Sequence, residues 1–522
     1  MTSASTFGDR RAVWAFALGC AMVTVGVLLH LPMFAMARSM GYRLAGMPMD
    51  LPMLAGMGLI VAGVVVAGFG LLPRNLAAQR AAAANIEIAA PEDAALGWPH
   101  IRLMLVLTVA LVIDVMKPAS LGFTIPGMIG EYHVPKATVS LVPFFALLGT
   151  VTGSIAWGVI ADVYGRKASI LLSAVMFVGT SICGAMPSLP WNIGMCFMMG
   201  AAAGGMLPVT YALLAEMMPN RHRGWSLVLV GGLGAVGGYF AASGISAELQ
   251  PIFGWRILWL VNLPTGLLLV LLGGLIPESA KFLLARGRRA EAEAVMRRFG
   301  ARAVAAPARV PTGAATLPQL GHGRVAARLI ALSVTALAWG AINFGLLLWL
   351  PADLVERGYS VGLTSSLLAQ SALIACPTVL LAALLYSRWS TKWSLATMIV
   401  ITVIGLVGVL RLPVGESPVL AVALLIIGSN GIIAIVLPYA AESFPLRVRG
   451  RATGWVAACT KAGGLLAQIL SITALVPSMG MVAAAIIVPT LAALVLVAWF
   501  GRETRGIDLR NLDPDELAQA AY

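Results

Sequence analysis

Three charged residues lie inside long apolar stretches of this 522-residue chain and could do chemistry there. Asp114 and Lys117 are three residues apart within one apolar run, and Lys461 lies within another. Residues three apart are neighbours on a helix, so Asp114 and Lys117 project from one face. A charge held away from water is costly, and charges in such places commonly serve a proton or an ion. The chemistry to expect is an acid that takes up a proton and an ammonium group that binds an anion.

These charges allow two interpretations. Asp114 and Lys117 could form a neutral structural pair, which is the commoner fate of close opposite charges. Such a pair gives no reason for the third charge at Lys461. With Asp114 able to take up a proton, the two lysines would favour a carboxylate substrate. We predict Asp114 as the proton-coupling site, with Lys117 and Lys461 as contacts of a small organic anion.

The composition places these residues in a membrane protein. The chain is 59% hydrophobic and 11% charged, whereas soluble domains are about 45–50% apolar and about 25% charged. A net charge of +13 would suggest a nucleic-acid partner in a soluble protein. Here the cations can be assigned to loops on one side of a bilayer. The partners expected are therefore the lipid bilayer, a small-molecule substrate and protons, and no nucleic acid.

Fourteen apolar runs are each close to the length of about 20 residues that crosses a bilayer as a helix. The first run, 13–31, is longer than the apolar core of a signal peptide, about 7–15 residues, so we predict a retained helix. The fold class is an all-α polytopic membrane protein. Its predicted parts are an added helix pair with a connecting segment (1–100), six helices (101–276), a basic cytoplasmic loop (277–328), six helices (329–500) and a cytoplasmic tail (501–522).

The distribution of cations supports this topology. If both termini are cytoplasmic, most of the 35 lysines and arginines fall on the inner side, as the positive-inside rule requires. The cations predicted on or near the outer side are Arg38, Arg43, Lys136, Arg256, Arg357 and Arg411. We expect a multi-pass protein of the cell inner membrane that works as a monomer.

An acid-and-arginine motif occurs twice and indicates two homologous halves. Nine residues beginning at Glu216 recur from Glu442, with five identical positions at an offset of 226. Glu278 has a counterpart in Glu503 at an offset of 225. A carboxylate at the inner end of a helix can pair with arginines across the halves when the cytoplasmic side is closed. We predict a cytoplasmic gate of Glu216, Arg221, Arg223, Glu278, Glu442, Arg447, Arg449 and Glu503. The alternative is that the arginines anchor helix ends and the prolines of the motif stop helices.

A short polar loop follows the second core run and carries Asp162, Gly165, Arg166 and Lys167. A plain turn with cytoplasmic anchors would explain the glycine and the two cations. It does not explain Asp162, because an unpaired carboxylate so near the membrane is costly. We therefore expect Asp162, Arg166 and Lys167 to take part in the cytoplasmic gate.

The loop motif, Gly-three residues-Asp-two residues-Gly-Arg-Lys, resembles the signature of the major facilitator superfamily. The resemblance implies two six-helix halves with the substrate between them at the midplane, and a latch formed by the loop. Pro277-Glu-Ser-Ala-Lys-Phe-Leu283 and the Glu503-Thr-Arg-Gly tail resemble the sugar-porter, organic-ion and synaptic-vesicle-glycoprotein-like branch. The resemblance covers residues 101–510, so the N-terminal helix pair departs from the family pattern of twelve helices.

The predicted substrate site also departs from that branch. Sugar porters carry a Gln-Gln pair on the seventh helix, where this chain has Trp339-Gly-Ala-Ile-Asn343, and we expect Asn343 to contact the substrate. The arginine that partners a first-helix acid in the branch is replaced by Cys196, and Lys117 or Lys461 could take its place. A sugar needs dense hydrogen-bonding groups, so sugar transport is not favoured.

These observations predict a secondary active transporter that carries a small carboxylate by proton-coupled symport and alternating access. One alternative is a proton-antiport exporter of drugs or secondary metabolites, and another is a membrane sensor that does not transport. No nucleotide loop or nucleophile triad is recognisable, so we expect no enzyme activity and no cofactor. A Met-rich outer loop could bind copper(I), but no cysteine accompanies it and we predict no metal site.

Overall fold

The computed structural model describes residues 10–71, 86–89, 95–285, 288–300, 302–305, 323–412, 416–444, 446–473 and 479–505. Helices make up nearly all of this part, which confirms the predicted fold class. Thirteen helices in it are long and apolar enough to cross a membrane, and a shorter apolar helix spans Ile257–Gly273. Within the described residues, all fourteen predicted apolar runs are mainly helical.

The chain forms two compact units. The first comprises Met1–Arg223 and Gly244–Pro307, and the second comprises Gly224–Ser243 and Ala308–Tyr522. The long helix α11 (Asn220–Phe253) contributes its ends to the first unit and its middle to the second. The sequence predicts this helix as part of the N-terminal six helices, 101–276.

The first unit begins with the added helix pair, α1 (Arg10–Leu28) and α3 (Leu51–Leu71), joined by α2 (Leu31–Met36) and η1 (Ala37–Met40). Its core elements are α5 (Trp98–Tyr132), α6 (Lys136–Val139), α7 (Leu141–Tyr164), α8 (Arg166–Gly179), η2 (Thr180–Ala185), α9 (Leu189–Ala203), α10 (Met206–Met217), α12 (Ile257–Leu260) and α13 (Asn262–Gly273).

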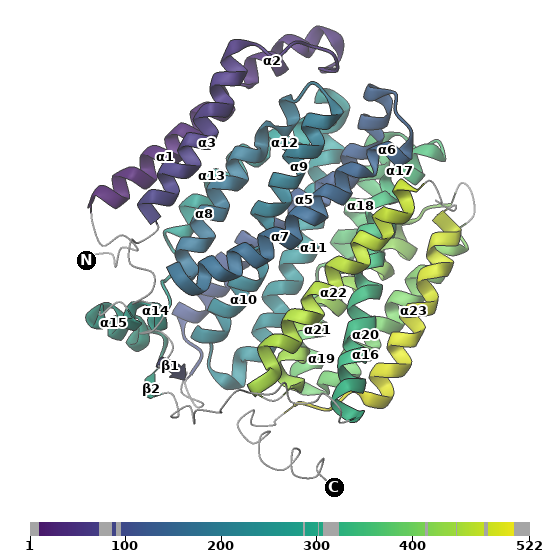
Figure 1. Ribbon diagram of the computed structural model, residues 1–522. Coiled ribbons are helices and arrows are strands. Elements are labelled where there is room, and N and C mark those ends of the chain that lie inside the picture. The colour runs from purple at the N-terminus through teal and green to yellow at the C-terminus, as the bar shows by residue number, and fades with distance from the viewer. Residues whose placement is uncertain are drawn as a thin grey trace. The chain divides into compact units, whose positions relative to one another are not determined.

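Helices α1 and α3 pack side by side (Figure 1), with glycines spaced by seven residues at their contact. Gly19 and Gly26 lie on α1, and Gly56, Gly63 and Gly70 lie on α3. A Cβ atom added at any of these five positions would overlap backbone or side-chain atoms of the other helix. Residues seven apart share one helix face, so the two backbones approach closely along the whole hairpin.

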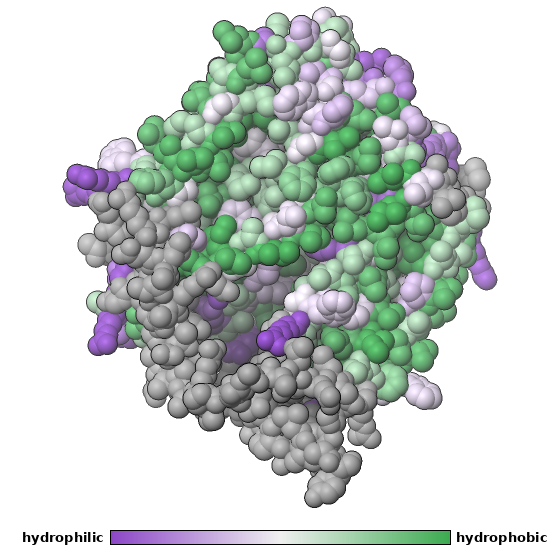
Figure 2. All heavy atoms as spheres, viewed as in Figure 1, coloured by the Kyte–Doolittle hydropathy of each residue, from purple (hydrophilic) through white to green (hydrophobic). Residues whose placement is uncertain are grey.

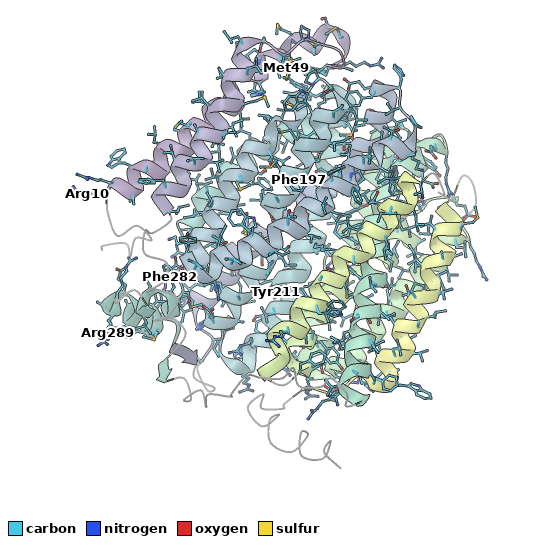
Figure 3. All side chains as sticks on the ribbon, viewed as in Figure 1. Arg10, Met49, Phe197, Tyr211, Phe282 and Arg289 are labelled. Carbon is cyan, nitrogen blue, oxygen red and sulfur yellow. The ribbon has the colours of Figure 1, made fainter. Side chains whose placement is uncertain are left out.

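The hairpin presents a second face to the core of its unit and a third face outward. Gly179 of α8 lies against Val23 and Ile60 of the hairpin. Large side chains such as Trp14 and Phe69 are exposed, and the apolar colouring of this surface is visible in Figure 2. Arg10 and Met49 mark opposite ends of the hairpin in Figure 3. An exposed apolar face between two such ends suits a lipid environment.

A small substructure forms from the connecting segment and the central loop of the first unit. It contains α14 (Ala280–Ala285), α15 (Arg289–Phe299), β1 (Ile86–Ala89) and β2 (Arg302–Ala305), with the two strands antiparallel. Figure 3 shows Phe282 and Arg289 on these helices. The Nε2 atom of His100, at the start of α5, lies 3.3 Å from the carbonyl oxygen of Phe299. This contact fastens α15 to the first core helix.

The second unit contains the remaining helices around a core that includes Trp339, Tyr386, Tyr439 and Phe444. Its elements are α16 (Gly323–Ala341), the π-helical turn η3 (Ile342–Leu347), α17 (Leu348–Glu356), α18 (Val361–Ala375), α19 (Thr378–Arg388), α20 (Thr391–Leu410), α21 (Val419–Ser443), α22 (Leu446–Ile472) and α23 (Met479–Phe500).

Candidate functional site

The first unit buries the predicted proton site within the long helix α5. Asp114 is 5% exposed and Lys117 is fully buried. Pro118 lies inside the same helix. Proline has no N–H, so the helix loses the hydrogen bond that would otherwise reach the carbonyl of Asp114. The backbone is therefore weakened at the acid.

Lys117 binds the end of a neighbouring helix. Its Nζ donates to the Phe177 carbonyl oxygen at 2.7 Å and to the Thr180 hydroxyl, and lies 4.0 Å from the centre of the Phe177 ring. Helix α8 changes to the 3-10 helix η2 at this point, where unpaired carbonyls give the helix end a partial negative charge. The ammonium group is thus stabilised without contact with solvent.

The structure brings Asp114, Lys117 and Cys196 into one electrostatic cluster, together with Cys183. Cys196 is the position where family resemblance places an arginine. Lys117 therefore supplies a cation beside Asp114 from the same helix rather than from the fourth.

In the second unit Lys461 lies on α22 and Asn343 lies in the π-helical turn η3, and these two elements are in contact. Lys461 and Asn343 are both half-buried. The Lys461 Nζ lies 5.1 Å from the centre of the Phe344 ring. An aromatic face attracts a cation in this position.

Four of the predicted gate residues lie together at the start of α8, namely Arg166, Lys167, Glu216 and Glu278. Arg166 Nη2 lies 3.2 Å from Glu216 Oε1, and Glu216 Oε2 accepts a hydrogen bond from the Ser279 hydroxyl at 2.6 Å. Glu278 accepts from the backbone N–H of Lys167 at 3.4 Å. An acid at a helix N-terminus is favoured by the exposed N–H groups there.

A matching cluster lies at the start of α20 in the second unit. Glu442 accepts hydrogen bonds from the Tyr386 hydroxyl at 2.6 Å and from the Thr504 hydroxyl at 2.9 Å. Glu503 accepts from the backbone N–H of Thr391 at 3.0 Å and from the Ser390 hydroxyl. Glu503 thus occupies the place at α20 that Glu278 occupies at α8.

The two clusters follow the internal repeat. Ser279 binds Glu216 in the first unit, and Thr504 binds Glu442 in the second. These hydroxyls follow Glu278 and Glu503 directly in the sequence. The same acid-hydroxyl pair therefore joins corresponding helix ends in both halves, and these contacts lie within each unit.

Hydrogen bonding controls the ionisation of Glu503. Partial burial would raise the pKa of this carboxyl, but hydrogen bonds from Ser390, Thr391 and the backbone of Arg505 outweigh that effect and hold its pKa below the usual value. A carboxylate that accepts several hydrogen bonds is stabilised in its charged form. Glu503 remains a charged acceptor at neutral pH.

The remaining predicted gate residues divide between described and undescribed positions. Arg221 is exposed and Arg223 is half-buried on α11. The side chains of Asp162, Arg447 and Arg449 lie outside the described residues, although all three positions are helical.

A buried ion pair in the first unit was not predicted from the sequence. Arg256 Nη2 lies 2.8 Å from Glu131 Oε1, with the side chains 0% and 5% exposed. Arg256 Nη1 also donates to the Met186 carbonyl at 2.7 Å. Glu131 ends an apolar run and Arg256 precedes another, which was the only signal available in the sequence.

The same ion pair binds the loop of the added helix pair. Glu131 Oε1 accepts hydrogen bonds from the backbone N–H groups of Leu44 at 2.8 Å and Ala45 at 2.9 Å. Its Oε2 accepts from the Trp255 indole N–H at 2.8 Å. The acid therefore connects the loop between α1 and α3 to the ends of α5 and α12.

Comparisons with known proteins agree with this architecture. A family model for the Major Facilitator Superfamily matches residues 106–468. The chain is 26% identical over 434 residues to the niacin transporter NiaP of Acinetobacter baylyi, which covers 81% of this chain and 98% of that protein. It is 29% identical over 399 residues to the 4-hydroxybenzoate transporter PcaK of Pseudomonas putida, covering 70% and 84%.

A solved structure supports the fold. The partially occluded, inward-open xylose transporter XylE of E. coli aligns with a TM-score of 0.63 at 17% identity, over 79% of this chain and all of that one. The helices α1 and α3 precede the region that the family model matches. Because that region covers more than half of the sequence, the chain belongs to the Major Facilitator Superfamily and is a membrane transporter, not an enzyme.

Proposed function

We propose that the protein is a symporter that moves a small carboxylate together with a proton, by alternating access of its two halves. The observation that carries this proposal is Lys461, a half-buried cation within the apolar helix α22. Relatives named as transporters of niacin, 4-hydroxybenzoate and benzoate support it, because each of these compounds carries a carboxyl group.

Lys461 and Asn343 are the proposed contacts of the carboxylate. Both side chains are half-buried, and an ammonium and an amide N–H are suitable donors to the two carboxylate oxygens. Lys117 is fully buried and its ammonium is bound by Phe177 and Thr180. Lys117 therefore contacts the anion only if it exchanges those partners, and we assign the first contact to Lys461.

Asp114 is the proposed proton carrier. Its protonation removes one negative charge next to Lys117, so the cluster becomes more positive by one unit. An anion is then favoured in the same transport step. Pro118 weakens the helix at this acid, which allows the local backbone to respond to the change in charge.

The acid clusters at the starts of α8 and α20 are the proposed cytoplasmic gate. The Arg166–Glu216 pair has side chains that are 18% and 22% exposed. Such partly exposed pairs contribute little, about 0–1 kcal/mol each. Such pairs can therefore break and form again within a transport cycle. For the closed state we propose further gate contacts of Asp162, Lys167, Arg221, Arg223, Arg447 and Arg449.

The remaining proposals concern the setting of the transporter. We place it in the inner membrane as a monomer with both termini cytoplasmic, because most cations then lie on the inner side. The added helix pair is proposed to span the same bilayer.

Uptake by proteoliposomes tests the function directly. Labelled nicotinate and benzoate are offered outside, under an inward proton gradient and under no gradient. The wild type should accumulate one of them above equilibrium only when the gradient is present. Asp114→Asn should allow equilibration without accumulation, whereas Lys461→Met should raise KM or abolish uptake.

Lys392→Met is the matched control for Lys461→Met. Lys392 also lies over an aromatic ring, with its Nζ 5.1 Å from the centre of Trp393, but it is at the start of α20. Its replacement should leave the KM for the substrate unchanged, because Lys392 lies at the proposed gate and not at the proposed substrate contacts. Full proton-driven accumulation by Asp114→Asn would exclude that residue as the proton carrier. Net extrusion of a compound by proton antiport would favour the exporter, and binding without any flux would favour the sensor.

A further inference from the structure

The π-helical turn Ile342–Leu347 interrupts the seventh core helix beside Lys461. A π turn leaves backbone groups outside the regular ladder, and such turns are frequent at functional sites. Here the carbonyl of Phe344 accepts a hydrogen bond from the Gln468 side-chain amide on α22. The Gln468 oxygen accepts from the Trp349 indole N–H at 3.3 Å. The irregular turn is thus bound by Gln468 of α22, which is itself bound by Trp349 of α17.

Close packing of the two helices brings the cation to this turn. A Cβ atom added at Gly340 of α16 would overlap the backbone of Thr460, and one added at Gly463 of α22 would overlap the backbone of Leu337. Glycines allow helices to approach at this distance. Lys461 follows Thr460 directly, so its side chain reaches the Phe344 ring from the neighbouring helix.

Phe344 lies between a cation and a second aromatic ring. Its ring centre is 5.1 Å from Lys461 Nζ and 5.7 Å from the Trp339 ring, which meets it edge-on at 85°. Phe344 is half-buried, so part of its ring remains outside the packed core. An edge-to-face pair of this kind fixes the orientation of both rings.

The indole N–H of Trp339 is a buried donor beside this ring. Trp339 is 6% exposed, and its Nε1 has no hydrogen-bond acceptor within the part of the chain that the structure describes. Buried donors are nearly always paired in folded proteins. A donor of this kind next to an accessible ring and a cation points to an acceptor that a ligand provides.

Given the proposed function, we infer that η3 and α22 form a subsite for an aryl carboxylate with a hydrogen-bond acceptor on its ring. Lys461 takes the carboxylate, Phe344 takes the face or edge of the ring, and the Trp339 N–H donates to a ring nitrogen or hydroxyl oxygen. A carboxylate without a ring would use only Lys461 and Asn343.

The first test compares ligands of equal size on the full-length protein in proteoliposomes. Benzoate and cyclohexanecarboxylate differ in the aromatic ring, and nicotinate adds an acceptor nitrogen to the ring of benzoate. The wild type should show a KM for benzoate that is about three- to tenfold lower than for cyclohexanecarboxylate. The KM for nicotinate should be about a further three- to tenfold lower than that for benzoate.

Two substitutions assign these preferences to residues. Phe344→Leu should raise the KM of benzoate and leave that of cyclohexanecarboxylate unchanged, while Phe344→Tyr, which keeps the ring, should behave as the wild type. Trp339→Phe removes the N–H and keeps an aromatic ring. It should therefore remove the preference for nicotinate over benzoate and leave the preference for benzoate over cyclohexanecarboxylate unchanged. Size-exclusion profiles establish that each variant is folded.

Three outcomes would overturn the inference. Equal KM values for benzoate and cyclohexanecarboxylate in the wild type would show that the ring is not recognised, even if a variant cannot be purified. An equal rise for both compounds in Phe344→Leu would reduce that residue to a packing role. A nicotinate preference that survives Trp339→Phe would exclude the N–H. Absence of uptake for every carboxylate would instead refute the proposed function.

Discussion

Replacing Glu131 by Gln should be among the most destabilising single changes in the first unit. Glutamine keeps the size and shape of the side chain but removes its negative charge. Arg256 is fully buried and would lose the carboxylate that lies 2.8 Å from its Nη2. The amide group of glutamine also cannot accept at both ends, so the Leu44 and Ala45 N–H groups or the Trp255 N–H would lose their acceptor.

The magnitude follows from burial rather than from the distance alone. Removing one member of a buried ion pair costs about 3–5 kcal/mol, because the other charge is left without compensation. The Arg357–Asp353 pair of the second unit has the same separation of 2.8 Å, but its side chains are 28% and 15% exposed. Asp353→Asn should therefore cost only about 0–1 kcal/mol.

Unfolding in mixed micelles measures both variants, and hydrogen exchange locates the effect. Glu131→Gln should lower the free energy of unfolding several-fold more than Asp353→Asn and should speed exchange at Leu44 and Ala45. The double variant Glu131→Gln/Arg256→Met should be less destabilised than Glu131→Gln alone, because no unpaired charge remains. Equal costs for the two single variants would refute the argument from burial.

Three further predictions concern the helix ends and the hairpin. Gly63→Ile should separate α1 from α3, because a Cβ there would overlap the Gly19 carbonyl. The rate of cysteine cross-linking between the two helices measures this separation and should fall. Gly165→Ala should be destabilising, since Gly165 has φ +99° and a Cβ would lie against the Glu278 carboxylate; a lower melting temperature measures this. Because the folded-state pKa of Glu503 is lowered, its stabilising effect should persist above the ordinary glutamate pKa of about 4.3 and disappear as the pH falls through the lower folded-state value. The stability difference between wild type and Glu503→Gln should therefore shrink in acid, and a difference that grows in acid would contradict this sign.

The helices and the internal repeat could be predicted from the sequence because both depend on local patterns. Apolar runs of membrane length must pair their backbone groups internally, so they form helices. The repeat of Glu216 and Glu278 at Glu442 and Glu503 predicted corresponding positions, and the matching hydrogen bonds from Ser279 and Thr504 occur in both units. The resemblance in the loop motif led to the family that the comparisons show.

Long-range contacts and local irregularities could not be predicted in this way. Glu131 and Arg256 are 125 residues apart, and each looks like an ordinary charge at a helix end. The π-helical turn has no sequence signature here, and the Gln468 amide that binds its Phe344 carbonyl lies on another helix. The complete burial of Lys117 depends on where α8 ends, which periodicity alone does not determine.

The glycine spacing of α1 and α3 has a consequence for the order in which the chain is assembled during translation. The contacts between these two helices lie within residues 10–71, so the hairpin can close before any core helix has left the ribosome. Its loop must wait longer, because Glu131 follows with α5 and Arg256 is made only after α11. Domains generally fold in the order of synthesis. A nascent chain that stops before residue 256 would therefore carry a closed hairpin whose loop is not yet fastened to the transporter.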